Sequence, residues 1–373
     1  MENWNEPYEP GIPSPRPPEG EPCWNPPPHP YYNPLSQPQQ PTLPFYIPPD
    51  APSDCQEYLY QKHFQLARRR LGSISGILLL YTVIMYACIF LVSGIVSAYY
   101  MLRSPNLTEY ELWEIISNNG WGYVLTVSFG MLLVLIWKKK PFFKNIAFTS
   151  HKPMTVGTFF SLFAFFLLGQ VLFSIFDTIV EQIFNLFGLS VMTSIESATS
   201  IGRSFSMLLY GCVLAPITEE IIFRGAVMRT MQPYGRRFAI LFSAILFGAF
   251  HGNLVQAPFA FAVGLVMGYT AMEYSIWWAI LLHFVNNCIL GEALPFLSNY
   301  LPFPMGEILQ ILVLFGGAMA GIVLCIVKWP EIKGHFQSEK ISGTSAKAIM
   351  TSPWTIIFLV LMFLSSLLGI TVL

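Results

Sequence analysis

Apolar segments long enough to cross a membrane follow one another through most of this chain. Of its 373 residues, 54% are hydrophobic and only 11% are charged, whereas about 25% of the residues in ordinary soluble domains carry charge. A transmembrane helix needs about 20 apolar residues. We therefore predict an all-α polytopic membrane protein with nine transmembrane helices. The nine apolar segments lie at residues 72–102, 121–137, 155–176, 204–223, 238–253, 256–273, 276–291, 307–327 and 354–373.

Positive charges recur in alternate loops between these segments. Lys and Arg gather in the cytoplasmic loops of membrane proteins. Here they cluster before the first segment and after the second, fourth and eighth, whereas the loops after the first and third are acidic or neutral. This alternation predicts a cytoplasmic N-terminus and an external C-terminus. The basic clusters are Arg68-Arg69-Arg70; Lys138-Lys139-Lys140 with Lys144 and Lys152; Arg229, Arg236 and Arg237; and Lys328, Lys333, Lys340 and Lys347.

Residues 1–55 form a segment rich in proline, with Gly, Asn, Gln and Tyr. Such a segment buries too little apolar surface to offset the entropy of ordering it. We predict a disordered cytoplasmic tail that is partly polyproline II. It is either a solvated tail or a docking arm for a partner with an aromatic groove. Residues 55–70 then predict a short amphipathic helix that leads to the membrane.

The six cysteines show no paired spacing, and four of them lie in apolar segments. We therefore expect neither a disulfide framework nor a cysteine-based metal site. The formal net charge of −1 and the absence of a basic patch do not suggest a nucleic-acid partner. The expected surroundings are the lipid bilayer and membrane-embedded peptides or proteins.

Two glycine pairs have the spacing that brings transmembrane helices close together. Gly264 and Gly268 form one G-x-x-x-G step, and Gly248 and Gly252 form another. Small residues at this spacing let two helix backbones approach each other. We expect the helices that carry them to pack closely.

Two adjacent carboxylates, Glu219 and Glu220, stand in the fourth apolar segment. On insertion scales a charge at the bilayer centre costs about 2.5–3.5 kcal/mol, so intramembrane acids are functional candidates. Arg224 follows Glu220 by four residues and faces it on a helix, with the acid N-terminal to the base. Glu219 is rotated about 100° away. We therefore expect Glu220 to pair with Arg224 and Glu219 to be left free.

Two histidines, His251 and His283, lie inside apolar segments, on two further helices. Asn287 follows His283 by four residues and shares its helical face, where an amide could donate to a substrate carbonyl or orient the imidazole. Asn286 faces about 100° away. Phe247 lies one turn before His251, where its ring forms either an aromatic wall of a polar site or part of the core.

Glu219, His251, His283 and Asn287 make a set that supports hydrolysis. A glutamate with a histidine can take a proton from water, while histidine and asparagine donors hold the oxyanion on the attacked carbonyl. Glu219, His251 and His283 are also the ligand types of a catalytic zinc site, although no H-E-x-x-H motif is present. We favour the metal-free route, and zinc stays open as the alternative.

Three motifs in this order resemble those of one membrane-protein family. They are Glu219-Glu220-x-x-x-Arg224, Phe247-x-x-x-His251 and His283-x-x-x-Asn287. The segment that carries them, 203–291, is similar to the CPBP family, the CAAX prenyl protease and bacteriocin-processing (Abi) intramembrane endopeptidases. On this division residues 56–202 hold the lead-in helix and the first three transmembrane helices, and residues 292–373 hold the C-terminal transmembrane helices.

The resemblance implies an α-helical membrane endopeptidase that cuts a membrane-associated peptide or protein. Carried over by position, it implies that Glu219 and His251 activate water and that His283 and Asn287 stabilise the oxyanion, with Glu220, Arg224 and Phe247 in support. Two other readings remain. The chain could be a proton-coupled transporter in which Glu219, His251 and His283 relay protons, or a non-catalytic membrane scaffold or immunity protein.

The charge alternation predicts that the loop at 138–153 faces the cytoplasm. A Lys140→Cys variant in intact cells should therefore resist a membrane-impermeant thiol reagent. A Glu111→Cys variant, in the outer loop that precedes the second apolar segment, should react. Labelling of both variants is compared with labelling after the cells are opened. Reaction of Lys140→Cys from outside would reverse the predicted topology.

Overall fold

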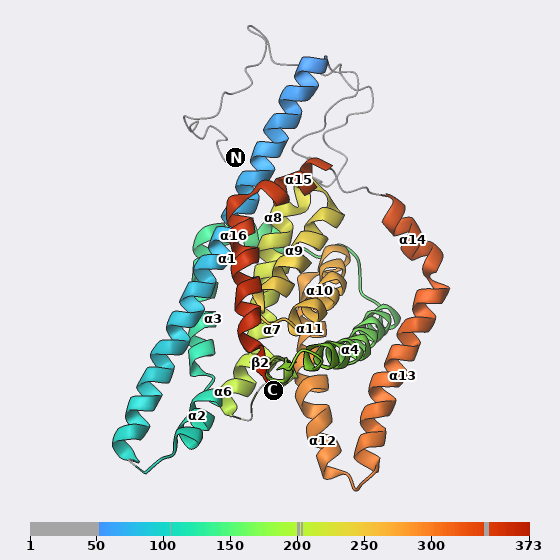
Figure 1. Ribbon diagram of the computed structural model, residues 1–373. Helices are drawn as coiled ribbons and strands as arrows, with labels where there is room; N and C mark the ends of the chain where they lie inside the picture. The colour runs from blue at the N-terminus through green and yellow to red at the C-terminus, as the bar shows by residue number, and fades with distance from the viewer. Residues whose placement is uncertain (1–51, 105, 200–201, 203, 339–342) are drawn as a thin grey trace.

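The computed structural model describes residues 52–104, 106–199, 202, 204–338 and 343–373 and is almost entirely helical (Figure 1). Backbone polar groups within a bilayer must be satisfied inside their own segment, which favours helices. Most of the tail predicted at residues 1–55 lies outside the described residues. The elements are α1 (Ser53–Arg103), α2 (Glu109–Ser117), α3 (Trp121–Phe142), η1 (Phe143–Ala147), α4 (Val156–Asn185), β1 (Leu189–Ser190), α5 (Met192–Thr199), α6 (Phe205–Leu208), η2 (Leu209–Leu214), α7 (Ala215–Glu220), η3 (Ile221–Met228), α8 (Arg229–Met231), η4 (Gln232–Tyr234), α9 (Arg236–Phe250), α10 (Gln256–Glu273), α11 (Ile276–Phe284), η5 (Val285–Ala293), α12 (Leu294–Tyr300), α13 (Met305–Val327), α14 (Trp329–Ser338), α15 (Gly343–Thr351), α16 (Pro353–Ser366), η6 (Leu367–Gly369) and β2 (Thr371–Val372).

The nine predicted transmembrane helices are confirmed only in part. Each apolar segment is helical, but among the described residues six helices are long and apolar enough to cross a membrane, and a seventh span requires counting a bent pair of helices as one. The shortfall lies in the middle of the chain, where α9 has 15 residues and α10 has 18. The multi-pass architecture therefore holds, and the count of nine is not confirmed.

Helix α1 joins two predicted elements into one. It runs without a break for 51 residues from Ser53, so the amphipathic lead-in and the first span are a single helix. Its N-terminal half is held by the C-terminal part of the chain, because Arg68 Nε donates to the Thr351 carbonyl at 2.9 Å and the buried Ser75 hydroxyl lies 2.9 Å from that of Thr355. Cys55 is disulfide-bonded, a bond that the cysteine spacing did not predict.

Helices α9 and α10 pack closely through three of the four predicted glycines. A Cβ on Gly248 would lie 2.7 Å from the Ala257 carbonyl oxygen, and one on Gly268 would lie 3.0 Å from Ile240. Gly264 faces α9 in the same way. Gly252 differs, because it lies beyond the end of α9 with a φ of 55°. The expected close packing is confirmed, with Gly252 serving a turn rather than the helix contact.

The span from Phe205 to Tyr234 is a helix interrupted by two π-helical stretches, η2 and η3. Pro216 follows η2 and carries no N–H to continue the backbone ladder. The Ala215 N–H donates to the Tyr210 carbonyl, five residues back, which is the π-helical pattern. Two more π-helices in the described part of the chain are η1, after α3, and η5, after α11. π-Helical stretches are frequent at functional sites.

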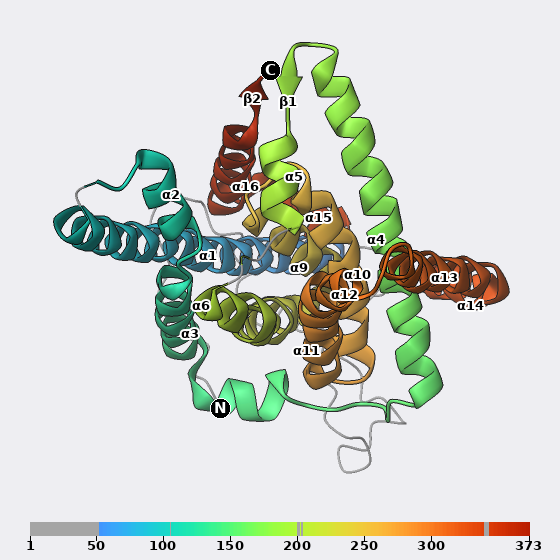
Figure 2. The same ribbon diagram turned by 90° about the horizontal axis from the view of Figure 1, so that it is seen from below.

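Contacts between distant segments agree with the loop alternation. Glu273 forms ion pairs with Lys152 at 2.7 Å and with Arg236, so the ends of three segments predicted to share one face do lie together. At the opposite end, β1 and β2 pair antiparallel, with Leu189 opposite Val372 (Figure 2). The C-terminus thus lies beside the loop after α4, as the alternation requires, whichever side of the membrane that is.

Candidate active site

The predicted site residues come from five neighbouring elements in the centre of the fold (Figure 1). Glu219 and Glu220 end α7, Arg224 lies in η3, His251 follows the last residue of α9, His283 lies in α11 and Asn287 in η5. Helix α7 contacts α11, η3 contacts α9 and η2 contacts η5. Segments more than sixty residues apart therefore meet at one place.

Glu220 and Arg224 form the predicted ion pair. Arg224 Nη1 lies 2.8 Å from Glu220 Oε1, and both side chains have no exposed surface. Arg224 Nη2 donates to the Gly264 carbonyl at 3.2 Å, and the guanidinium lies 4.2 Å from the centre of the Phe247 ring. The charge of Glu220 is thus neutralised locally, and Arg224 links α10 to the motif helix.

His283 is the point where the two carboxylates meet. Its Nδ1 donates to Glu220 Oε1 at 3.0 Å, and its Nε2 lies 3.9 Å from Glu219 Oε2. The two glutamates therefore reach opposite nitrogens of one imidazole. Glu219 keeps 14% of its side chain exposed and, unlike Glu220, forms no ion pair with an arginine of the described part of the chain. This matches the expectation that one acid is paired and the other is free.

His251 is held in one tautomer by its own helix. Its Nδ1 lies 2.8 Å from the Phe247 carbonyl oxygen, and because a carbonyl can only accept, Nδ1 carries the hydrogen. In the neutral ring Nε2 then keeps its lone pair. Glu219 is close enough to His251 for their charges to interact. His251 therefore offers an acceptor on the side of the ring away from its helix.

The Phe247 ring packs between the two histidines. Its centre lies 4.8 Å from that of His251 and 5.9 Å from that of His283, nearly perpendicular to both. It also has 1% exposed surface and belongs to the main hydrophobic core. Both readings of Phe247 from the sequence therefore apply, since one ring closes the core and forms a wall of the polar cluster.

Two hydrogen bonds hold the side chain of Asn287. Its Nδ2 donates to the Gly211 carbonyl at 3.1 Å, and its Oδ1 accepts from Asn286 Nδ2 at 2.9 Å. His283 and Asn287 thus both face the span from Phe205 to Tyr234, as their spacing predicted. Asn286, set aside from the sequence as facing another way, contacts Asn287 directly.

Sequence reasoning missed three polar residues beside this cluster. Tyr81 of α1 and Tyr210 of η2 are both electrostatically coupled to Glu219, and Gln170 of α4 donates to Asn286 at 2.7 Å. Gln170 had a signal, because an amide inside an apolar helix needs a partner. A tyrosine at membrane depth is a weaker indication of a polar partner than an amide is.

The donor types around Glu219 suit zinc, but their arrangement does not. Two imidazoles with Nδ1 held by oxygen acceptors resemble a metal site with its outer hydrogen bonds. Within the described part of the chain, however, no three His, Cys, Asp or Glu side chains converge to hold a metal ion. We therefore derive no chemical step through a metal.

One comparison with known proteins identifies this region. Residues 201–289 match the family model described as type II CAAX prenyl endopeptidase Rce1-like. This confirms the family resemblance of the segment predicted at 203–291. This family is a class of proteases, and the matched part is under a quarter of the chain's length. No curated protein and no solved structure matches the chain.

The burial of the Glu220–Arg224 pair predicts a large loss of stability when only one partner is removed. Arg224→Met leaves a buried carboxylate without its arginine and should lower the free energy of unfolding by about 3–5 kcal/mol. Thermal unfolding in detergent measures the change. Replacing both residues, as Glu220→Leu with Arg224→Met, should recover part of the loss.

The matched control is the exposed pair of Lys328 and Glu331, 3.1 Å apart. Lys328→Met should change stability by no more than about 1 kcal/mol. Equal effects of Arg224→Met and Lys328→Met would show that the buried pair does not support the fold.

Proposed function

We propose that this chain is an intramembrane endopeptidase that hydrolyses a peptide bond of a membrane-associated peptide or protein. The observation that carries the proposal is the placement of Glu219. Among the described residues this partly exposed carboxylate has no ion pair with an arginine, and it lies 3.9 Å from Nε2 of the imidazole that the second glutamate holds. The backbone carbonyl that holds Nδ1 of His251 leaves Nε2 as the acceptor of that ring. The family match of residues 201–289 supports the same reaction class.

The first step is activation of water by Glu219 and His251. One water hydrogen is donated to the Glu219 carboxylate and the other to Nε2 of His251. As the water oxygen attacks the carbonyl carbon, its proton passes to Glu219.

The second step is stabilisation of the oxyanion by His283 and Asn287. Since Nδ1 of His283 donates to Glu220, only Nε2 can face the substrate, and it donates only when the ring is the imidazolium. Asn287 Nδ2 has a second hydrogen beyond the one given to Gly211. Both groups are thus donors for the oxygen that becomes negative.

The reaction ends when the C–N bond breaks. The tetrahedral intermediate collapses, the electron pair returns to the carbonyl, and Glu219 gives its proton to the departing nitrogen. Water has then supplied a hydroxyl to the new carboxyl group and a proton to the new amine. Glu220 and Arg224 hold His283 in place throughout.

The substrate and the orientation belong to the same proposal. The family description makes a peptide that ends in a prenylated C-a-a-X sequence the first candidate to test. The loop charges favour a cytoplasmic N-terminus, which places Glu219, near the basic loop at 229–237, toward the cytoplasmic half of its span.

The mechanism predicts which substitution blocks turnover without blocking binding. Glu219→Gln should lose nearly all cleavage of a membrane-inserted reporter peptide yet still bind it. His283→Ala and Asn287→Ala should each reduce kcat by roughly 10²–10³-fold, the scale of a lost oxyanion donor. Cleavage is measured with the purified full chain in lipid nanodiscs, with the reporter tested both farnesylated and unmodified.

Matched controls for these variants are the exposed Glu307→Gln and His151→Ala, which should cleave like the original chain. Retained turnover in Glu219→Gln would overturn the mechanism. If the original chain cleaves no reporter but moves protons across the membrane of a lipid vesicle, and Glu219→Gln stops this, the transporter reading is correct instead.

The metal-free route predicts that active enzyme contains no stoichiometric zinc and keeps its activity after chelation. Elemental analysis of the active preparation and assays with and without a chelator measure both. One zinc per chain, lost together with activity and restored with it, would refute the metal-free route and make Glu219, His251 and His283 the ligands to test.

A further inference from the structure

Gln170 is a polar side chain in the middle of the apolar helix α4, outside the segment that matches the protease family. A half-buried amide in such surroundings needs hydrogen-bond partners. Gln170 Nε2 donates to Asn286 Oδ1 at 2.7 Å, across 116 positions of sequence. The partner is therefore the residue next to Asn287.

Three amides form an amide relay, which is a chain of hydrogen bonds that all run in the same direction. Gln170 donates to the oxygen of Asn286, the Asn286 nitrogen donates to the oxygen of Asn287 at 2.9 Å, and the Asn287 nitrogen donates to the Gly211 carbonyl at 3.1 Å. In each amide the oxygen accepts and the nitrogen donates. Turning over the Asn286 or Asn287 amide would place two oxygens or two nitrogens against each other, so the relay fixes which way these amides point.

The last acceptor of the relay exists because η2 is π-helical. The Ala215 N–H donates to Tyr210, and the residue five positions after Gly211 is Pro216, which has no N–H. The Gly211 carbonyl is thus left without a π-helical backbone donor, and Asn287 supplies one. The relay is anchored to the backbone of the motif helix at this end.

We propose that Gln170 is a positioning residue that acts through Asn286 to orient Asn287 in the active site. The inference rests on the proposed function, since Asn287 is there an oxyanion donor. With its oxygen held by Asn286 and one hydrogen held by Gly211, the Asn287 amide has one hydrogen left to point at substrate. Preorganised donors of this kind contribute most to stabilising developing charge.

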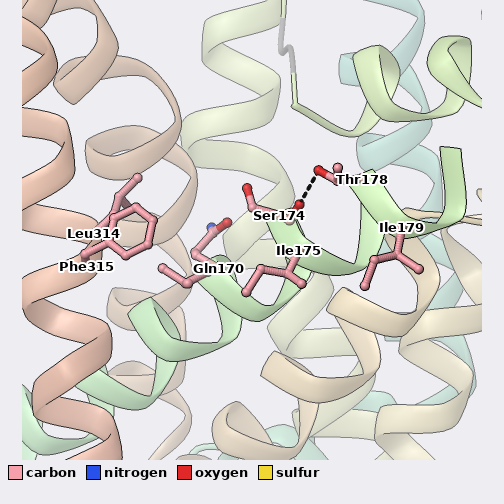
Figure 3. Close-up of a pocket in the computed structure, with 8 residues that line it drawn as sticks. Gln170, Ser174, Ile175, Thr178, Ile179, Leu314 and Phe315 are labelled. Atoms are coloured by element: carbon pink, nitrogen blue, oxygen red, sulfur yellow. Dashed lines mark hydrogen bonds between the residues drawn. The ribbon is translucent and has the colours of Figure 1, made fainter. Parts of the chain in front are cut away.

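The outer end of the relay is accessible. Gln170 lines a cavity of about 400 Å³ between α4 and α13, together with Ser174, Ile175, Leu314 and Phe315 (Figure 3). Figure 3 places Gln170 and Ser174 near each other on α4. Ser174 shares the cavity and has no place in the relay. Comparing substitutions of Gln170 and Ser174 therefore separates an effect of changing the cavity from an effect of breaking the relay.

The kinetic test compares Gln170→Met with Ser174→Ala in the full chain in nanodiscs. Gln170→Met keeps the length of the side chain and removes its donor. It should lower kcat about tenfold, the scale of one hydrogen bond, with KM unchanged, while Ser174→Ala should leave both unchanged. In an Asn287→Ala background Gln170→Met should cause no further loss, because residues acting in one network are not additive.

The proposal would be overturned if the double variant lowered kcat by the product of the factors for Gln170→Met and Asn287→Ala. A normal kcat in Gln170→Met would also overturn it. A readout without turnover keeps it distinct from the proposed function. With ¹⁵N-asparagine labelling, the side-chain amide signals of Asn287, assigned by their loss in Asn287→Ala, should shift in Gln170→Met and stay in place in Ser174→Ala. Unshifted signals overturn the relay, whereas a shift in a chain that cleaves no reporter supports the relay and refutes only the peptidase function.

Discussion

The buried ion pair between Glu220 and Arg224 is the interaction on which the rest of the site depends. In a medium of low dielectric constant a lone charge is costly, and a close opposite charge offsets that cost. The pair also ties elements together, because Arg224 reaches the Gly264 carbonyl of α10 and Glu220 reaches His283 of α11. Gly264 belongs to this arrangement, since a Cβ there would lie 3.2 Å from the guanidinium.

Two adjacent carboxylates serve different purposes because their surroundings differ. Glu220 has no exposed surface and an arginine at 2.8 Å, whereas Glu219 keeps some exposure and faces an imidazole at 3.9 Å. Environments that separate the behaviour of two acids are a recurring way to divide chemical roles. Here Glu220 holds Nδ1 of His283, while Glu219 keeps part of its side chain exposed.

Local patterns in the sequence predicted local contacts well. The Glu220–Arg224 pair, the face shared by His283 and Asn287, and the close packing at Gly248 and Gly268 follow from helical spacing alone. Spacing could not show the π-helices, which shift the phase of the pattern, nor the contact of Gln170 with Asn286, which joins helices far apart in sequence. The count of nine spans is not confirmed. Apolar content marked the segments of α9 and α10, but these helices have 15 and 18 residues, whereas a transmembrane helix needs about 20.

The length of α1 determines how far its first residue, Ser53, lies from the apolar part of the same helix. The apolar segment starts near residue 72, so the 19 residues 53–71 precede it in the same unbroken helix, a rise of about 28 Å at 1.5 Å per residue. Figure 1 shows these turns projecting beyond the other helices. If α1 stands upright in the membrane, Ser53 lies beyond the layer of lipid head groups, which adds only about 5–8 Å to each side of the hydrocarbon core.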